Sequence, residues 1–121
     1  MTWTYNVRTK EFHLNGELKF KSQYAGAVGY KNDPGFECIK NKGPLPRGSY
    51  RIGAPYDSKK TGPYTLVLIP QSANNMCGRG DFRIHGDSKK EPGSASEGCI
   101  VAEKDFREKI WESGDRELIV K

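Results

Sequence analysis

The sequence predicts a mainly β, single-domain protein, a sandwich or barrel of short strands with one short helix near the C-terminus. Three observations support this prediction. The chain has 121 residues, which suits one domain spanning residues 1–121. Its 14 glycines are typical of short strands joined by tight turns and are rare in helical bundles. Finally, only one stretch of the chain shows helical periodicity.

The N-terminal part is predicted to form a β-meander. Residues 3–7 alternate between apolar and polar side chains, as a half-buried strand does. Two further alternating runs, residues 11–14 and 17–20, are separated by Asn15-Gly16. Asn-Gly favours a type I′ hairpin turn, because both central residues of that turn need a positive φ. The meander should therefore turn at these two residues.

Short strands are also expected in the rest of the chain. Residues 65–69 form the most convincing buried strand, because five strand-compatible residues lie between Pro63 and Pro70. Further short strands are expected at residues 49–52, 82–85, 99–101 and 118–120.

The predicted helix covers residues 103–111. Phe106 and Ile110 are four residues apart, which places them on one helical face. Gly114 follows as a plausible stop signal.

The net charge of +5 fits either ordinary solubility or an anionic partner. Lys and Arg are spread along the chain without a basic helix or arm, which disfavours nucleic acid. No apolar run approaches membrane-spanning length, so membrane insertion is not expected. The N-terminus lacks the pattern of a signal peptide, so synthesis in the cytoplasm is expected.

The chain contains three cysteines, Cys38, Cys77 and Cys99. Because the number is odd, at least one thiol is free or pairs with another chain. No C-x-x-C spacing is present, which disfavours a structural zinc site. A disulfide between Cys38 and Cys77 is possible, and the sequence does not decide it.

The chemistry is predicted to centre on Cys99 and His85. A strand, a loop and a second strand separate them by fourteen residues, enough to bring both side chains to one end of neighbouring strands. The thiolate is the reactive form of cysteine and needs a nearby base. Gly98 suggests a tight turn that aims the amides of Gly98 and Cys99 at a developing oxyanion. The alternative interpretation of Cys99 is a buried structural thiol, and His13 is interpreted as a solvent-side histidine.

These motifs resemble the L,D-transpeptidase family. The chain carries Ile84-His85-Gly86, then Ser96-Glu97-Gly98-Cys99-Ile100, with Pro46-Arg47-Gly48-Ser49-Tyr50 upstream, in the family's order. It departs from the family by a shorter loop after the histidine, by Glu97 in place of histidine, and by lacking an arginine after the cysteine. In these departures it is more similar to the compact L,D-transpeptidase-related toxins delivered by type VI secretion.

The resemblance implies roles for individual residues. Cys99 would be the nucleophile and His85 the base and then the acid, with Ser96 matching the family's Ser/Thr position. A main-chain carbonyl near Gly86 would orient the histidine. The Asp87 side chain is the alternative group for orienting the histidine. Asp87 is also counted among the predicted substrate-binding residues. Apart from the resemblance, Arg79 or Arg83 is predicted to hold a substrate carboxylate, because arginine binds carboxylates in a bidentate geometry; the alternative for each is a solvated surface residue.

The resemblance also implies a single L,D-transpeptidase-like catalytic domain that acts on peptidoglycan stem peptides. It would act as an L,D-carboxypeptidase or exchange the terminal D-amino acid, without a metal or an organic cofactor. Such a toxin would be delivered to the periplasm of a target bacterium and matched by a periplasmic immunity protein. The alternatives are a different cysteine amidase or peptidase, and a non-enzymatic wall-binding module.

Overall fold

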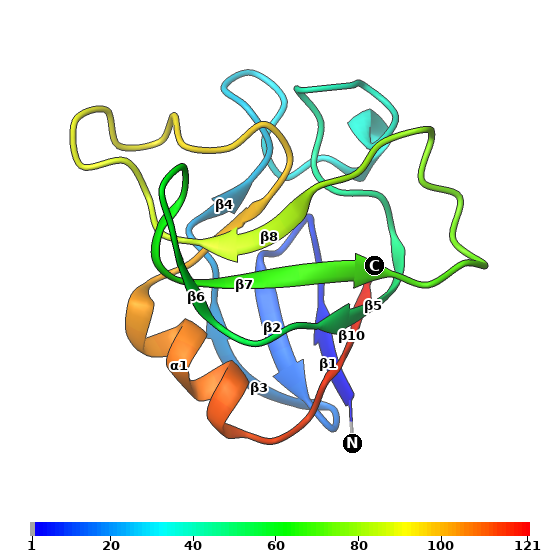
Figure 1. Ribbon diagram of the computed structural model, residues 1–121. Coiled ribbons are helices and arrows are strands. Elements are labelled where there is room, and N and C mark those ends of the chain that lie inside the picture. The colour runs from blue at the N-terminus through cyan, green and yellow to red at the C-terminus, as the bar shows by residue number, and fades with distance from the viewer. Residues whose placement is uncertain (1) are drawn as a thin grey trace.

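The protein is mainly β, with one α-helix near the C-terminus, as the sequence predicts. The computed structural model describes residues 2–121. Its strands join in the order β3-β2-β1-β10-β5-β7-β8-β9-β4, and β6 pairs with β7. Long loops gather above β8 in Figure 1, and the helix lies below it. The elements are β1 (Thr2–Tyr5), β2 (Glu11–Leu14), β3 (Glu17–Lys21), β4 (Tyr24–Ala25), the 3₁₀ turn η1 (Pro34–Phe36), β5 (Gly48–Ile52), β6 (Tyr56–Ser58), β7 (Gly62–Pro70), β8 (Phe82–His85), β9 (Ile100–Val101), α1 (Lys104–Glu112) and β10 (Glu117–Val120).

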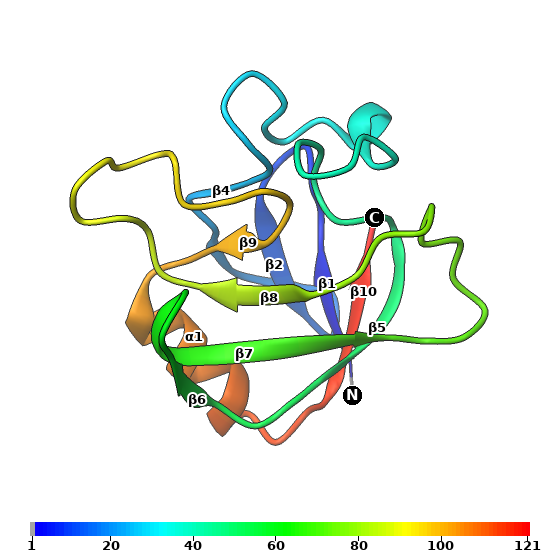
Figure 2. The ribbon, with the colours of Figure 1, turned by 45° about the horizontal axis from the view of Figure 1, so that its top comes forward.

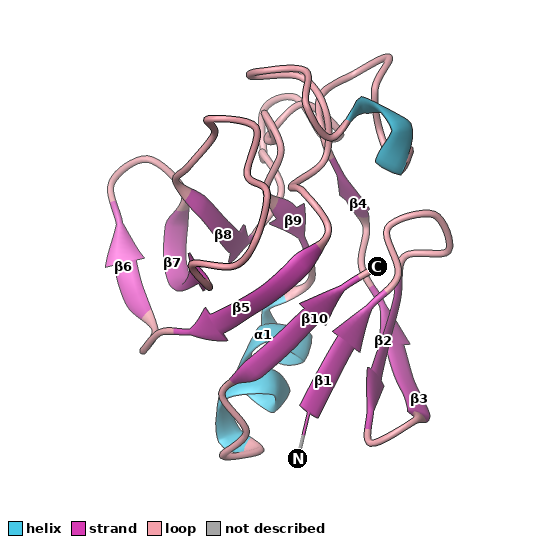
Figure 3. Ribbon diagram, turned by 90° about the vertical axis from the view of Figure 1, so that its right-hand side faces the viewer, coloured by secondary structure: helices cyan, strands magenta, loops and turns pink. Residues whose placement is uncertain are grey.

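The N-terminal meander forms as predicted. Asn15 and Gly16 have φ angles of 52° and 81°, the positive values that a type I′ turn needs. Strand β1 pairs antiparallel with β2 and parallel with the C-terminal β10, so the first and last strands lie side by side (Figure 3). This pairing joins the meander to the rest of the sheet.

Aromatic side chains fill the interior beside the meander. Trp3, Tyr5 and Phe12 are almost fully buried. Phe20 stacks on Phe106 of α1, with ring centroids 4.3 Å apart. Because Ile110 on the same helix is also buried, the apolar face predicted for residues 103–111 does face the core, although α1 begins and ends one residue later.

Strand β7 is longer than the sequence predicts. It includes Pro63 and Pro70, which were expected to bound it, and Ile69 is 48% exposed. Proline is tolerated near the ends of a strand, where a missing N–H breaks little of the ladder. Leu66 and Leu68 pack in the core, whereas Val67 and Ile69 on the opposite face are less buried, so this part of β7 is buried on one face rather than on both.

Strands β8 and β9 run parallel to each other (Figure 2). The two-residue strand β4 extends the sheet beyond β9, and the short β6 pairs with β7; the sequence predicted neither strand. Among the described residues, no helix is long and apolar enough to span a bilayer.

Candidate active site

The parallel pairing of β8 and β9 brings Cys99 and His85 to one pocket. Ile84 is paired with Ile100, so extending the register by one residue sets Cys99 beside Arg83. His85 lies two residues beyond Arg83 and therefore points to the same face of the sheet. Both side chains line a pocket of about 490 Å³. The strand–loop–strand segment thus brings Cys99 and His85 to the lining of one pocket.

Cys99 carries a free thiol that is partly exposed. Its Sγ lies 3.7 Å from the carbonyl oxygen of Asp81. Burial raises the pKa of the Cys99 thiol, while the backbone N–H and the positive charge of Arg83 oppose that rise. The protonated thiol is therefore favoured in the resting protein, and chemistry at this sulfur requires a base.

His85 is suited to be that base. Its side chain is 2% exposed, and its Nδ1 lies 2.8 Å from the carbonyl oxygen of Gly86. A carbonyl only accepts hydrogen bonds, so Nδ1 carries the hydrogen and Nε2 has the free lone pair. Burial lowers the pKa of His85, the Gly86 hydrogen bond raises it, and the positive charges of Arg107 and Arg83 lower it further. The neutral imidazole is therefore the resting form.

Ser96 braces the backbone around the cysteine. Its Oγ donates to the Cys99 carbonyl at 2.7 Å and accepts from the Gly98 N–H at 2.9 Å and the Gly26 N–H at 3.1 Å. Because the Gly98 N–H is engaged, the predicted pair of oxyanion donors is reduced to the Cys99 N–H. Ser96 thus contacts the main chain of Cys99 and not its thiol, so it acts through the backbone.

Gly98 is required by its surroundings. Its φ is +150°, and a Cβ there would lie 2.6 Å from Nη2 of Arg79 and 2.8 Å from the Phe82 ring. Close packing on both sides therefore holds the turn that presents Cys99.

Arg79 holds the pocket loops together. It is 8% exposed, and its two terminal nitrogens donate to the carbonyls of Glu37, Gly43, Pro44 and Glu97. These bonds engage the nitrogens that a substrate carboxylate would need, so the carboxylate role predicted for Arg79 does not fit. Arg83 also lines the pocket, and only its Nε bonds to a side chain, the Tyr56 hydroxyl at 2.9 Å. Arg83 remains the predicted carboxylate ligand.

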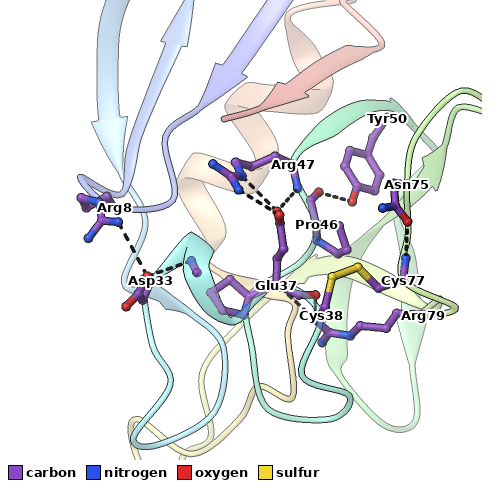
Figure 4. Close-up of polar contacts among 12 residues, drawn as sticks. Arg8, Asp33, Glu37, Cys38, Pro46, Arg47, Tyr50, Asn75, Cys77 and Arg79 are labelled. Carbon is purple, nitrogen blue, oxygen red and sulfur yellow. Dashed lines mark hydrogen bonds and ion pairs between the residues drawn. A yellow bond between two sulfur atoms is a disulfide. The ribbon is translucent and has the colours of Figure 1, made fainter.

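A disulfide between Cys38 and Cys77 ties two of these loops together, which answers the pairing that the sequence left open. Figure 4 shows it beside Arg79 and the ion pair between Glu37 and Arg47, whose Nη2 and Oε2 atoms are 2.9 Å apart. The hydrogen bonds from Arg47 lower the pKa of Glu37. Covalent and polar contacts together fix this wall of the pocket.

Asp87 organises the loop between β8 and β9. Its carboxylate accepts from the Tyr24 hydroxyl at 2.6 Å and from the Gly93 and Ser88 amides. Burial raises the pKa of Asp87, but these hydrogen bonds outweigh it and lower the pKa. Asp87 lines a second pocket of about 900 Å³, which His85 also lines and Cys99 does not. The orientation of His85 thus comes from the Gly86 carbonyl, not from the Asp87 side chain.

Two residues of the site escaped sequence reasoning. Tyr24 anchors Asp87, and Arg107 of α1 lies buried against Gly86. No sequence motif marks either residue, because Tyr24 bonds to a side chain far away in the sequence and Arg107 bonds to backbone carbonyls. Among the described residues, no group of three or more His, Cys, Asp or Glu side chains is placed to hold a metal ion.

Comparison with known families adds to this geometry. Residues 20–118 match the model of the Tlde1 domain, a range that includes His85, Ser96 and Cys99. The chain belongs to the Tlde1 domain family. This domain is associated with type VI secretion effectors, which confirms the predicted relation to such effectors at the level of the domain. A search of curated proteins finds no match to this chain.

Proposed function

We propose that this Tlde1-domain protein is a cysteine acyltransferase that acts on peptidoglycan stem peptides, as an L,D-carboxypeptidase or by exchanging the terminal D-amino acid. The observation that carries the proposal is the placement of Cys99 and His85 in one pocket, with the Nε2 lone pair of His85 free to accept a proton. A partly exposed thiol beside a buried, neutral imidazole is the arrangement that covalent acyl transfer requires.

In the first half-reaction, Nε2 of His85 takes the proton from the Cys99 thiol as Sγ attacks the carbonyl before the terminal D-alanine. In this proposal the Cys99 N–H stabilises the oxyanion of the tetrahedral intermediate. The intermediate collapses when the C–N bond breaks, and His85 returns the proton to the departing amine. D-alanine leaves, and the stem peptide remains bound to Sγ as a thioester.

In the second half-reaction, a nucleophile attacks the thioester carbonyl and passes a proton to His85. Water gives a shortened stem, and the amine of a free D-amino acid gives an exchanged stem. The C–S bond breaks, and the sulfur regains its proton from His85. The cycle needs no metal or organic cofactor.

The charge of the pocket supports an anionic substrate. Lys40, Lys60 and Arg83 line it together with the acidic Asp81 and Glu97. Arg83 suits the carboxylate of a stem peptide, because its guanidinium can bind a carboxylate with two parallel hydrogen bonds.

The Cys38–Cys77 disulfide supports action in the periplasm. Disulfides persist in oxidising compartments such as the bacterial periplasm and are rare in the cytosol. Peptidoglycan lies in that same compartment. We therefore propose delivery of the protein into the periplasm of a target bacterium.

Purified muropeptides incubated with the protein test the reaction directly. Mass spectrometry should show loss of the terminal D-alanine, or its replacement when a labelled D-amino acid is added. Cys99→Ala should lower turnover by about 10³-fold or more, because no other group supplies the nucleophile. His85→Gln removes the proposed base and should also lower turnover. His13→Gln is its matched control, since His13 lies outside the pocket. Equal turnover by Cys99→Ala and the parent would refute the proposal.

Expression in bacteria tests the site of action. The protein should be harmless in the cytosol and toxic when fused to a periplasmic signal, and Cys99→Ala should remove that toxicity. Toxicity confined to the cytosolic form would instead indicate an intracellular target.

We also propose a periplasmic immunity protein that covers the pocket. The chain's net charge of +5 favours an acidic inhibitor, because opposite charge speeds encounter and sets register. Co-expression of the neighbouring open reading frame with the periplasmic form should protect the cells. If no product of a neighbouring open reading frame protects the cells or co-purifies with the protein, the proposal of an immunity partner is wrong.

A further inference from the structure

Arg107 is a buried cation next to the proposed base. Its side chain comes from α1 and is 3% exposed. Nε donates to the Tyr64 carbonyl at 3.0 Å, Nη2 to the Pro63 carbonyl at 3.1 Å, and Nη1 to the Ala102 carbonyl. These acceptors are neutral, and no ion pair among the described residues involves Arg107. Its positive charge is thus satisfied by hydrogen bonds to neutral carbonyls, and the negative charge of Glu108 acts on it without forming an ion pair.

The guanidinium lies against the backbone that orients His85. A Cβ on Gly86 would lie 3.2 Å from Nη1 of Arg107. The Ala102 residue that Arg107 holds donates its own N–H to the His85 carbonyl at 2.9 Å. Arg107 is therefore linked to the His85 carbonyl through Ala102 and lies next to Gly86. The Gly86 carbonyl in turn accepts from Nδ1 of His85.

We propose that Arg107 is a positioning residue for the acyl transfer: it braces the backbone next to Gly86, whose carbonyl accepts from Nδ1 of His85, and its positive charge, which no ion pair neutralises, favours the neutral imidazole with a free Nε2. This inference rests on the proposed function for its catalytic meaning. Its structural part, the protonation state and tautomer of His85, holds with or without a substrate.

Other charged groups also face His85. Arg83 comes from its own strand, Asp87 from the loop that follows, and Lys60 from the turn between β6 and β7, while the Cys99 thiol lies ahead of β9. Asp87 acts in the opposite sense, because its negative charge favours a protonated imidazole. Its hydrogen bonds to Tyr24, Ser88 and Gly93 engage that carboxylate elsewhere. Arg107 differs from these groups because hydrogen bonds to three backbone carbonyls fix the position of its guanidinium.

Nuclear magnetic resonance of His85 tests the proposal. In the wild-type protein, His85 should titrate below the ordinary histidine value near 6.5, and its neutral form should carry the proton on Nδ1. A midpoint at or above that ordinary value, or a proton on Nε2, would overturn the proposal without any variant.

Variants at position 107 separate charge from structure. Arg107→Gln keeps a donor and removes the charge, so the His85 midpoint should move up by about one pH unit. Arg107→Lys keeps the charge and should leave the midpoint low. The acid limb of the kcat/KM profile should follow the His85 midpoint in each variant. If both variants fold and leave the midpoint where it is in the wild type, Arg107 is merely structural and the proposal fails.

The same titrations in the Cys99→Ala background separate this inference from the proposed function. That variant retains the His85 environment whether or not the protein acts on peptidoglycan. An inactive wild-type protein with a normal Arg107 response would refute the function and leave the positioning of His85 intact. A wild-type protein that is active, but in which the His85 midpoint does not respond to substitution of Arg107, would refute the positioning of His85 and leave the proposed function intact.

Discussion

The meander and the pocket wall are held together by different physics. Strands β1 to β3 bury a cluster of large aromatic rings, among them Trp3 and Phe12, whose stabilisation is roughly proportional to apolar area. The pocket wall has long loops instead, and Arg79, the Cys38–Cys77 disulfide and Ser96 hold them through a few specific bonds. The meander should therefore respond to lost volume, and the pocket wall to the loss of single polar or covalent partners.

The largest expected effect is in the meander. Trp3→Ala should lower the free energy of unfolding by about 4 kcal/mol, because it empties a fully buried aromatic site. Urea denaturation measures this loss. Leu18→Ala, in the same meander but 50% exposed, should change stability by less than about 0.5 kcal/mol. Comparable losses for both variants would contradict the view that buried area stabilises this region.

Breaking the disulfide should come next and should act on the other region. Cys38→Ser should cost about 3 kcal/mol, because the bond closes a loop across a sequence separation of 39. Hydrogen exchange should show the extra opening in residues 37–44 and 77–81 rather than in β1 to β3. Cys77→Ser should match it, and the double variant should cost no more than either alone. Additive losses would show that each cysteine matters for a reason other than the bond.

A methyl group at Gly98 should distort the pocket directly. Gly98→Ala should cost about 2 kcal/mol, because its φ of +150° disfavours a side chain and the new Cβ meets Arg79 and Phe82. Alkylation of Cys99 should change in rate as the turn shifts. Gly80→Ala in the neighbouring loop is the control, since a Cβ there has no heavy atom within 4 Å. Equal effects at both glycines would remove the argument for close packing at Gly98.

Loss of the Ser96 hydroxyl should lower the free energy of unfolding by less than the changes above, and it should change the reactivity of Cys99. Ser96→Ala should cost about 1 kcal/mol, because it leaves the buried Gly26 and Gly98 amides without their acceptor. The rate of Cys99 alkylation should change with it. Ser94→Ala removes an exposed hydroxyl of the same loop and should leave that rate unaltered. A normal alkylation rate in Ser96→Ala would show that this brace is dispensable.

The smallest expected effect is on the pH dependence of stability. Burial lowers the pKa of His85 in the folded state, so the unfolded state binds more protons in the window between that lowered pKa and the ordinary value near 6.5. Stability should therefore fall as the pH drops through this window. Urea denaturation of the wild type and of His85→Gln at pH 5 and pH 7 measures the contribution. An unchanged pH dependence in His85→Gln would contradict it.

Much of the fold could be predicted because its signals are local. Asn15-Gly16 marks a turn through the φ angles of two adjacent residues, and the run before His85 forms β8 over residues 82–85 as expected. The juxtaposition of Cys99 and His85 followed from a short strand–loop–strand segment. The two-residue β4 was missed, because so short a run has no measurable alternation.

The sequence alone determined the mainly β class and the C-terminal helix, and it led to the proposal of Cys99 and His85 as the reacting pair. Only the tertiary structure decided that Arg79 holds loops and that the Gly98 N–H bonds to Ser96 rather than to an oxyanion. It also placed Arg107 beside Gly86. The physical reason lies in the acceptors. Both arginines bond to backbone carbonyls, which every residue carries, so no side-chain pattern marks the partner until the chain has folded.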